Sequence, residues 1–159
     1  MGLRTYTPPP PLDRFVDVLW LYKGYQPTHA HSKERLMPDG SVALVINLRD
    51  DVTRIYDRNH LEKCHTMPGA ILCGVHTECF VIDTKEQADV VGVQFRPGGA
   101  FPFLGLPPGE THNLHVPLDA LWGSLAKEVR ERRNIKGRPF WSRVWVLASI
   151  PTERNALNG

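Results

Sequence analysis

The sequence predicts a mainly β fold that ends in helices, an α+β arrangement in which an antiparallel barrel or sandwich is followed by one or two helices. Short runs rich in β-branched residues recur along the first part of the chain, and turn-forming residues separate them. The intervals between these runs are too short for crossover helices, which argues against a parallel sheet. After Pro117 the spacing of the apolar residues becomes helical.

Composition and length narrow the class of protein. At 159 residues the chain has the length of one domain, and such a domain can bury its core without disulfides. Apolar residues make up 42% of the chain and charged residues 23%, which is ordinary for a globular protein. Because the formal charge is only +2, we expect no direct nucleic-acid binding by this chain.

Targeting signals are not apparent in the sequence. No run reaches the roughly 18 apolar residues of a membrane helix, and the N-terminus lacks the apolar region of a signal peptide. The three cysteines, an odd number, fit reduced thiols better than a disulfide framework. We therefore expect a cytoplasmic protein that does not enter a membrane.

The N-terminal region contains a proline run and two strand-like segments. Residues 7–12 are expected to be extended, because each proline restricts itself and its predecessor. The aromatic-rich run Phe15–Tyr22 predicts a buried strand. A second strand is predicted over Ser41–Leu48, and we expect Val52–Tyr56 to be its hairpin partner across residues 49–51.

Three further short strands are predicted over Ala70–Cys73, Glu78–Asp83 and Asp89–Phe95. The last of them breaks at Arg96-Pro97-Gly98-Gly99, where glycines permit a sharp corner, and a short aromatic segment follows. We interpret this corner as the hinge between the β part of the chain and its helices.

Helices are predicted near the C-terminus. Apolar residues from Leu118 to Val129 recur at helical spacing, with an acidic residue near the start and basic residues near the end. Phe140–Ser149 predicts a second helix that stops before Pro151. The sequence thus divides into a β-rich domain with its helix, residues 1–133, and a C-terminal helix and tail, residues 134–159.

Two groups of residues have the chemistry of metal ligands. His29 and His31, followed by Glu34, resemble the first half of the metal-binding pattern of cupin barrels, but no histidine follows where the second half would fall. A second group has soft ligands that zinc accepts, without the usual paired spacing: Cys64, His65, Cys73, His76 and Cys79. We therefore expect no metal and no cofactor, and small buried thiols as the role of the cysteines.

The remaining candidate residues carry no catalytic signature. No nucleophile elbow and no cysteine in a basic setting is present. Arg96 at the corner is expected either to hold backbone carbonyls or to clamp an anionic ligand, with Asp39 as a candidate partner. Trp141 and Trp145 on the predicted second helix are candidate interface residues.

Several segments resemble a known family. The run Glu34–Gly40 with the strand that follows it, the run Gly92–Phe101 and the run Val116–Leu118 resemble the N-terminal DUF6597-type domain of AraC-family transcriptional regulators. The resemblance covers roughly residues 8–133. It implies a cupin-like β-barrel that binds an effector or mediates dimerisation. In that family a domain with two helix-turn-helix units binds DNA, and none is expected here because only ten residues follow Ser149.

The resemblance brings no catalytic residues, so we expect a protein that is not an enzyme. Its function would be that of a ligand-sensing or dimerisation domain of an AraC-like regulator that lacks the DNA-binding domain. The partners implied are an unidentified small-molecule effector and a second copy of the chain. The alternative is a metal-dependent cupin-type enzyme that uses His29, His31 and Glu34.

Overall fold

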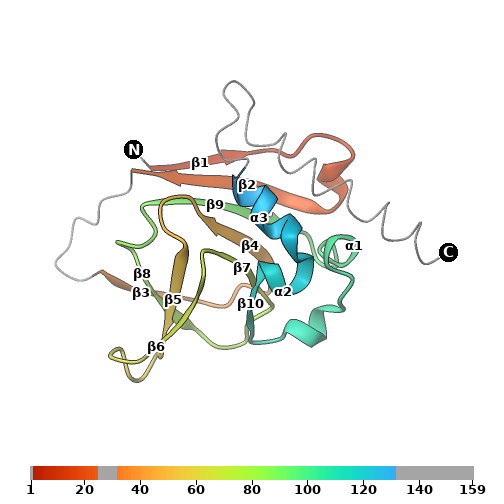
Figure 1. Ribbon diagram of the computed structural model, residues 1–159. Coiled ribbons are helices and arrows are strands. Elements are labelled where there is room, and N and C mark those ends of the chain that lie inside the picture. Colours follow the sequence, from red (N-terminus) through yellow and green to blue (C-terminus); the bar gives the residue numbers. More distant parts are fainter. Residues whose placement is uncertain (1, 25–31, 132–159) are drawn as a thin grey trace.

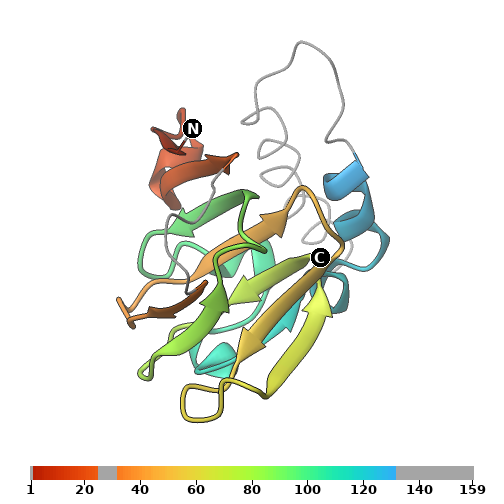
Figure 2. The same ribbon diagram turned by 90° about the vertical axis from the view of Figure 1, so that its left-hand side faces the viewer.

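The computed structural model describes residues 2–24 and 32–131, which form two antiparallel sheets and a set of short helices (Figure 1). The larger sheet contains, in spatial order, β1 (Gly2–Tyr6), β2 (Val16–Lys23), β9 (Asp89–Phe95), β4 (Ala43–Asn47), β7 (Ala70–Cys73) and β10 (His115–Pro117). The smaller sheet contains β3 (Lys33–Leu36), β8 (Phe80–Asp83), β5 (Val52–Tyr56) and β6 (Cys64–Pro68), and Figure 2 brings it to the front. The predicted fold class, mainly β with helices after the sheets, is confirmed.

The helices are short, and the α-helices follow β9 in the chain. In the part of the chain that the structure describes, two 3-10 turns, η1 (Leu12–Arg14) and η2 (Pro108–Thr111), accompany three α-helices, α1 (Phe101–Leu104), α2 (Leu118–Trp122) and α3 (Ser124–Glu131). In Figure 1, α2 and α3 lie across the large sheet. No helix among residues 2–24 and 32–131 is long and apolar enough to cross a membrane.

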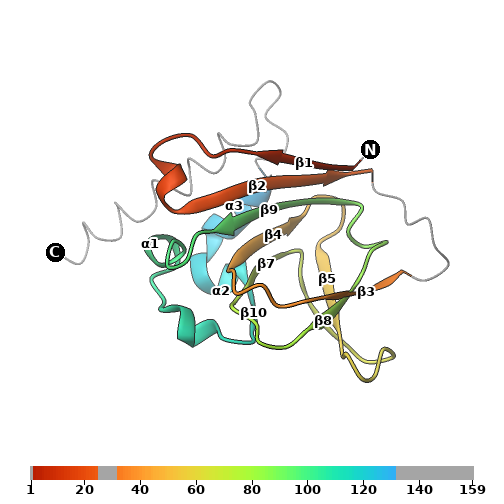
Figure 3. The same cartoon turned by 180° about the vertical axis from the view of Figure 1, so that it is seen from behind.

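Successive strands repeatedly change sheets. Strands β4, β7 and β9 lie in the larger sheet, whereas β3, β5, β6 and β8 lie in the smaller one. From β3 to β9, the chain therefore stays in one sheet only between β5 and β6 and crosses the sandwich at every other connection. The resulting orders β2-β9-β4-β7 and β3-β8-β5-β6 are those of a jelly roll, the arrangement that cupins also have. Seen from behind, β1 adds an edge strand beside β2 (Figure 3).

The predicted hairpin between Ser41–Leu48 and Val52–Tyr56 is wrong, although both strands exist. Strand β4 pairs with β7 and β9, and β5 pairs with β6 and β8. The buried Asn47 turns the chain, because its Oδ1 accepts from the backbone N–H groups of Arg49 and Asp50 at 3.0 and 3.1 Å. The short connection therefore crosses between the sheets.

Other differences concern the helices and the prolines. The helix predicted from Leu118 to Val129 is divided into α2 and α3 at Gly123, whose φ of 57° does not continue a right-handed helix. Residues 7–12 are not extended throughout: the N–H of Leu12 donates to the carbonyl of Pro9 at 2.9 Å, and Leu12 begins η1 with its side chain in the core. Strands β1, β3, β6 and β10 were not predicted, and the predicted helix 140–149 lies outside the described residues.

The main hydrophobic core lies between the large sheet and the helices. Residues Leu19, Val93, Leu44 and Leu72 are lateral neighbours in β2, β9, β4 and β7, so their side chains form a row across one face. This row belongs to one buried cluster with Leu118, Trp122 and Phe103 of the helices. The opposite face of the same sheet is turned toward the smaller sheet.

The corner at Arg96–Gly99 ties β9 to the start of β2. The N–H of Arg96 donates to the carbonyl of Phe15 at 2.8 Å, and the N–H of Gly99 donates to the carbonyl of Arg96 at 2.8 Å. A Cβ added to Gly99 would lie 2.1 Å from the carbonyl oxygen of Phe15. The glycine is therefore required by the close approach of two backbone segments.

We predict that Gly99→Ala destabilises the domain by about 2 kcal/mol, because the new methyl group must displace backbone rather than a flexible side chain. Gly109→Ala is the matched control, since nothing lies within 4 Å of the corresponding Cβ. Urea unfolding of both variants measures the difference. Equal stabilities of the two variants would contradict the assigned contact.

Candidate functional site

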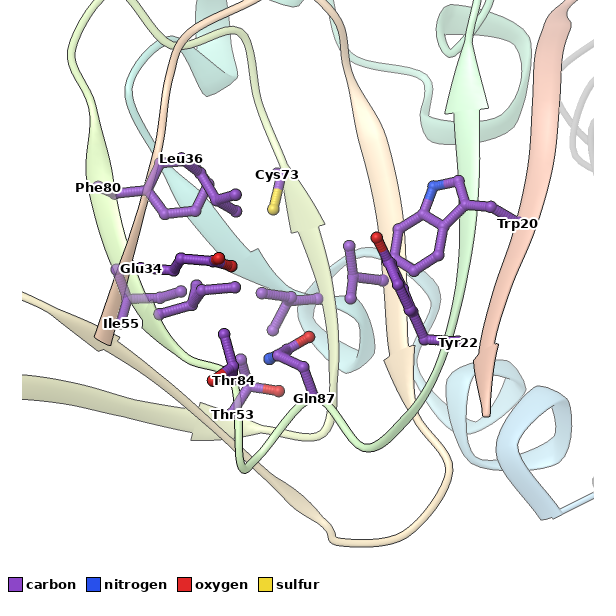
Figure 4. A pocket seen from close by; sticks show the side chains of 13 residues that line it. Trp20, Tyr22, Glu34, Leu36, Thr53, Ile55, Cys73, Phe80, Thr84 and Gln87 are labelled. Carbon is purple, nitrogen blue, oxygen red and sulfur yellow. The ribbon is translucent and has the colours of Figure 1, made fainter. Parts of the chain in front are cut away.

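The space between the two sheets contains a pocket of about 320 Å³ (Figure 4). From the large sheet it is lined by Trp20, Tyr22, Val45, Ile71 and Cys73. From the small sheet and the turn after β8 it is lined by Glu34, Leu36, Thr53, Ile55, Phe80, Ile82, Thr84 and Gln87. The lining is mostly apolar, and its volume lies at the lower end of the range of small-molecule sites.

A glycine in β9 makes room for the aromatic wall of the pocket. Trp20, Gly92, Val45 and Ile71 are lateral neighbours on the face of the large sheet opposite the main core. A Cβ added to Gly92 would lie 2.0 Å from Cε2 of Trp20, so the indole occupies the space of the missing side chain. The ring of Tyr22 meets the indole edge-on, with 5.7 Å between centroids. These two rings form one side of the pocket (Figure 4).

Strand β3 provides the carboxylate of the pocket. Glu34 and Leu36 alternate with Lys33 and Arg35, and they pair with Ile82 and Phe80 of β8. Glu34 and Leu36 line the pocket together with both of these partners, and Figure 4 shows the Glu34 side chain extending into it. The Glu34 residue as a whole is exposed, so it lies at a part of the pocket that is open to solvent.

Thr84 and Gln87 form the polar floor of the pocket, and the buried Asn47 holds this floor in place. Thr84 and Gln87 come from the turn that connects β8 to β9. The Nδ2 group of Asn47 donates to the carbonyl of Glu86 at 3.1 Å and to that of Val52 at 3.2 Å. The amide thereby fixes the floor to the start of β5, so the polar groups of the floor have a defined position.

Cys73 contributes a neutral wall rather than a nucleophile. Burial raises the pKa of the Cys73 thiol to about 12, because a thiolate would lose its hydration there. A reactive cysteine needs the opposite shift. Its role in the pocket is therefore that of a small apolar side chain.

Two histidines pack against the pocket residue Phe80. The ring centroid of His115 lies 4.5 Å from those of His76 and Phe80. His76 donates from Nδ1 to the carbonyl of Gly74 at 2.7 Å, while the Nε2 atoms of His76 and His115 are buried without a hydrogen-bond partner. Burial, and next the neighbouring His76 and His65, lower the pKa of His115 to about 4. His115 is consequently neutral near neutral pH.

The predicted ligand-binding residues Arg96 and Asp39 line a different hollow, of about 460 Å³, at the corner. Arg96 donates from Nε to the carbonyl of Asp13 at 2.7 Å, and its Nη1 lies 3.4 Å from Oδ1 of Asp17. Asp39 accepts from the hydroxyl and the N–H of Ser41 at 2.6 and 2.9 Å, and the hydroxyl bond lowers the pKa of this carboxyl. Arg96 thus holds a backbone carbonyl, one of its two expected roles, while ligand binding by this pair stays a prediction.

The other predicted site residues are placed only in part. Glu34 lies in the inter-sheet pocket, whereas His29, His31, Trp141 and Trp145 lie outside the described residues. Within residues 2–24 and 32–131, no three or more His, Cys, Asp or Glu side chains are grouped so that they could hold a metal ion.

Most residues of the pocket could not be predicted from the sequence. Trp20 and Tyr22 were predicted to be strand residues, and their even spacing in β2 is the signal that could have placed both on one face. Strand β3 was missed because Lys-Glu-Arg-Leu has no apolar run.

Comparison with known proteins bears on the same part of the chain. A family model described as a domain of unknown function, DUF6597, matches residues 4–117. The matched range contains every strand that lines the pocket. No curated protein and no solved structure matches the chain.

We predict that Gly92→Ala destabilises the domain by about 2 kcal/mol, because the methyl group displaces the indole of Trp20. The cost should fall by at least half in a Trp20→Leu background, since the smaller side chain leaves space for the methyl group. Chemical unfolding of the two single variants and the double variant measures this coupling. If the changes in the free energy of unfolding were strictly additive, the methyl group at position 92 and the indole of Trp20 would not compete for space.

We also predict that His115 makes the fold sensitive to acid. Its pKa falls from 6.5 in the unfolded chain to about 4 in the folded one, so its contribution is complete above pH 6.5 and is lost as the pH falls toward 4. Between about pH 7 and about pH 4.5, the wild type should lose about 2 kcal/mol more stability than His115→Phe. The exposed His112→Phe serves as the control and should follow the wild type. Unfolding measured over this pH range gives the comparison.

Proposed function

The chain belongs to the DUF6597 family, and we propose that its domain senses a small, largely apolar molecule bound in the pocket between the two sheets. The single observation that carries the proposal is the pocket itself, which has the size and lining of a small-molecule site. The main core of the domain lies on the other side of the large sheet. Ligand binding therefore does not require the opening of that core.

The large sheet offers a route from the pocket to the helices. Strands β2, β4 and β7 each contribute pocket residues on one face and a leucine of the main core on the other. That core contains Leu118 and Trp122 of α2, as well as Ala126 and Val129 of α3. A ligand that favours one arrangement of these strands would shift the population of helix positions.

This coupling fits a regulatory role. The motifs that resemble the N-terminal domain of AraC-family regulators support the proposal that the domain is their ligand-sensing or dimerisation unit. In such a regulator the helices after the β domain would pass the binding state on to a partner domain or a second copy. We propose no catalytic activity, since the one cysteine that lines the described pocket, Cys73, has a raised pKa and is not activated as a nucleophile.

The proposal predicts that phenylbutanol, a neutral apolar probe, binds in the pocket and raises the melting temperature. Val45→Phe fills the pocket and should abolish this increase in melting temperature, because Val45 lines the pocket from the strand between β9 and β7. Val52→Phe is the matched control: it is the same substitution in β5, at a position whose side chain alternates with the pocket residue Thr53. Thermal unfolding with and without the probe measures both variants.

An unchanged response in Val45→Phe would contradict binding between the sheets. Metal analysis of the same purified protein tests the metal-dependent cupin alternative. Stoichiometric metal that is lost in the His29→Ala, His31→Ala double variant would favour the enzyme over the sensor.

A further inference from the structure

The charged side chains of β3 lie on two opposite faces of the strand. Its sequence is Lys-Glu-Arg-Leu, and the alternation of a strand places Glu34 and Leu36 on the pocket face and Lys33 and Arg35 on the other. Lys33 donates to Oδ2 of Asp83 at 2.8 Å and lies 3.4 Å from the ring centroid of Tyr56. Lys33, one of the two cations next to Glu34 in sequence, is thus bound on the outer face.

The next cation along the wall is bound outside as well. Arg54 lies between the pocket residues Thr53 and Ile55 in β5, and its Nη1 lies 2.6 Å from Oε1 of Glu86. Among the described lining residues, Glu34 carries the only charge. The described wall of the pocket is therefore negative, although the chain as a whole has a formal charge of +2.

The aromatic residues of the pocket add to its preference for cations. Phe80 lies on the same wall as Glu34, two positions along the pairing of β3 with β8. Trp20 and Tyr22 face them from the large sheet (Figure 4). The faces of aromatic rings attract cations and do not attract anions. An anionic ligand would meet Glu34 without any compensating positive charge from the described lining.

From this arrangement we infer that the pocket selects an organic cation, an apolar molecule that carries an ammonium group next to the carboxylate of Glu34. The apolar body lies across the pocket against Trp20, Val45 and Ile71. This inference rests on the proposed function, since it names the chemical class of the ligand for the same pocket. It goes beyond that function because a sensor of neutral or anionic molecules would have the same fold.

Three probes with one apolar body test the charge preference: phenylbutylamine, phenylbutanol and phenylbutyrate. At neutral pH the amine should bind about five-fold more tightly than the alcohol, and the carboxylate should bind more weakly than both. Because Glu34 is exposed to solvent, the preference for the amine should decrease at high salt. Isothermal titration calorimetry measures the three affinities.

Glu34→Gln should remove the difference between amine and alcohol, because it lowers the affinity for the amine to that for the alcohol. Glu110→Gln, an exposed position away from the pocket, is the control and should keep the wild-type preference. Equal binding of amine and alcohol to the wild type would overturn the inference and leave the sensor proposal intact. Failure of all three probes to bind would contradict the proposed function itself.

Discussion

The structure depends on the two-sided alternation of the large sheet. Each of its central strands presents successive side chains to opposite faces, so one face can pack against helices while the other borders the pocket. Leu19 and Trp20 show the consequence, since these neighbours lie in the main core and in the pocket wall respectively. A shift of register by one residue would exchange the two faces and remove both the core and the pocket. The pairing of β9 with β2 on one side and with β4 on the other therefore determines stability and site together.

The second sheet is positioned by connections that cross the sandwich. Asn47 is the clearest case, because one buried amide turns the chain after β4, holds the start of β5 and fixes the turn before β9. All of these bonds are made by a side chain to backbone groups, which a buried segment must satisfy. The site is thus built from local turns that aim strands at the opposite sheet. Replacing the amide would affect the floor of the pocket as well as the crossing.

The strands with apolar runs were predictable from the sequence, and β5, β7 and β9 begin and end where the sequence placed them. Their partners were not predictable, because a short loop after β4 fits a hairpin and a crossing equally well until Asn47 is known to be buried. Strands with charged residues, such as β3, were missed because their stability comes from pairing and not from propensity. Since Glu34 lies on that strand, the charge of the pocket could not be derived from the sequence alone.

The corner after β9 contains a motif of the family resemblance, but it does not line the pocket between the sheets. The Arg-Pro-Gly-Gly run is the most distinctive stretch of the sequence, yet Arg96 bonds to the backbone of Asp13 and Phe15, so the run serves the join between β9 and β2. The pocket instead uses Trp20 and Gly92, residues that no motif singles out for binding. The corner joins the start of β2 to the end of β9, and beyond an irregularity between Val16 and Val18 the same two strands pair Trp20 with Gly92. The corner therefore helps to position the pocket wall through the sheet, although its residues do not line that pocket.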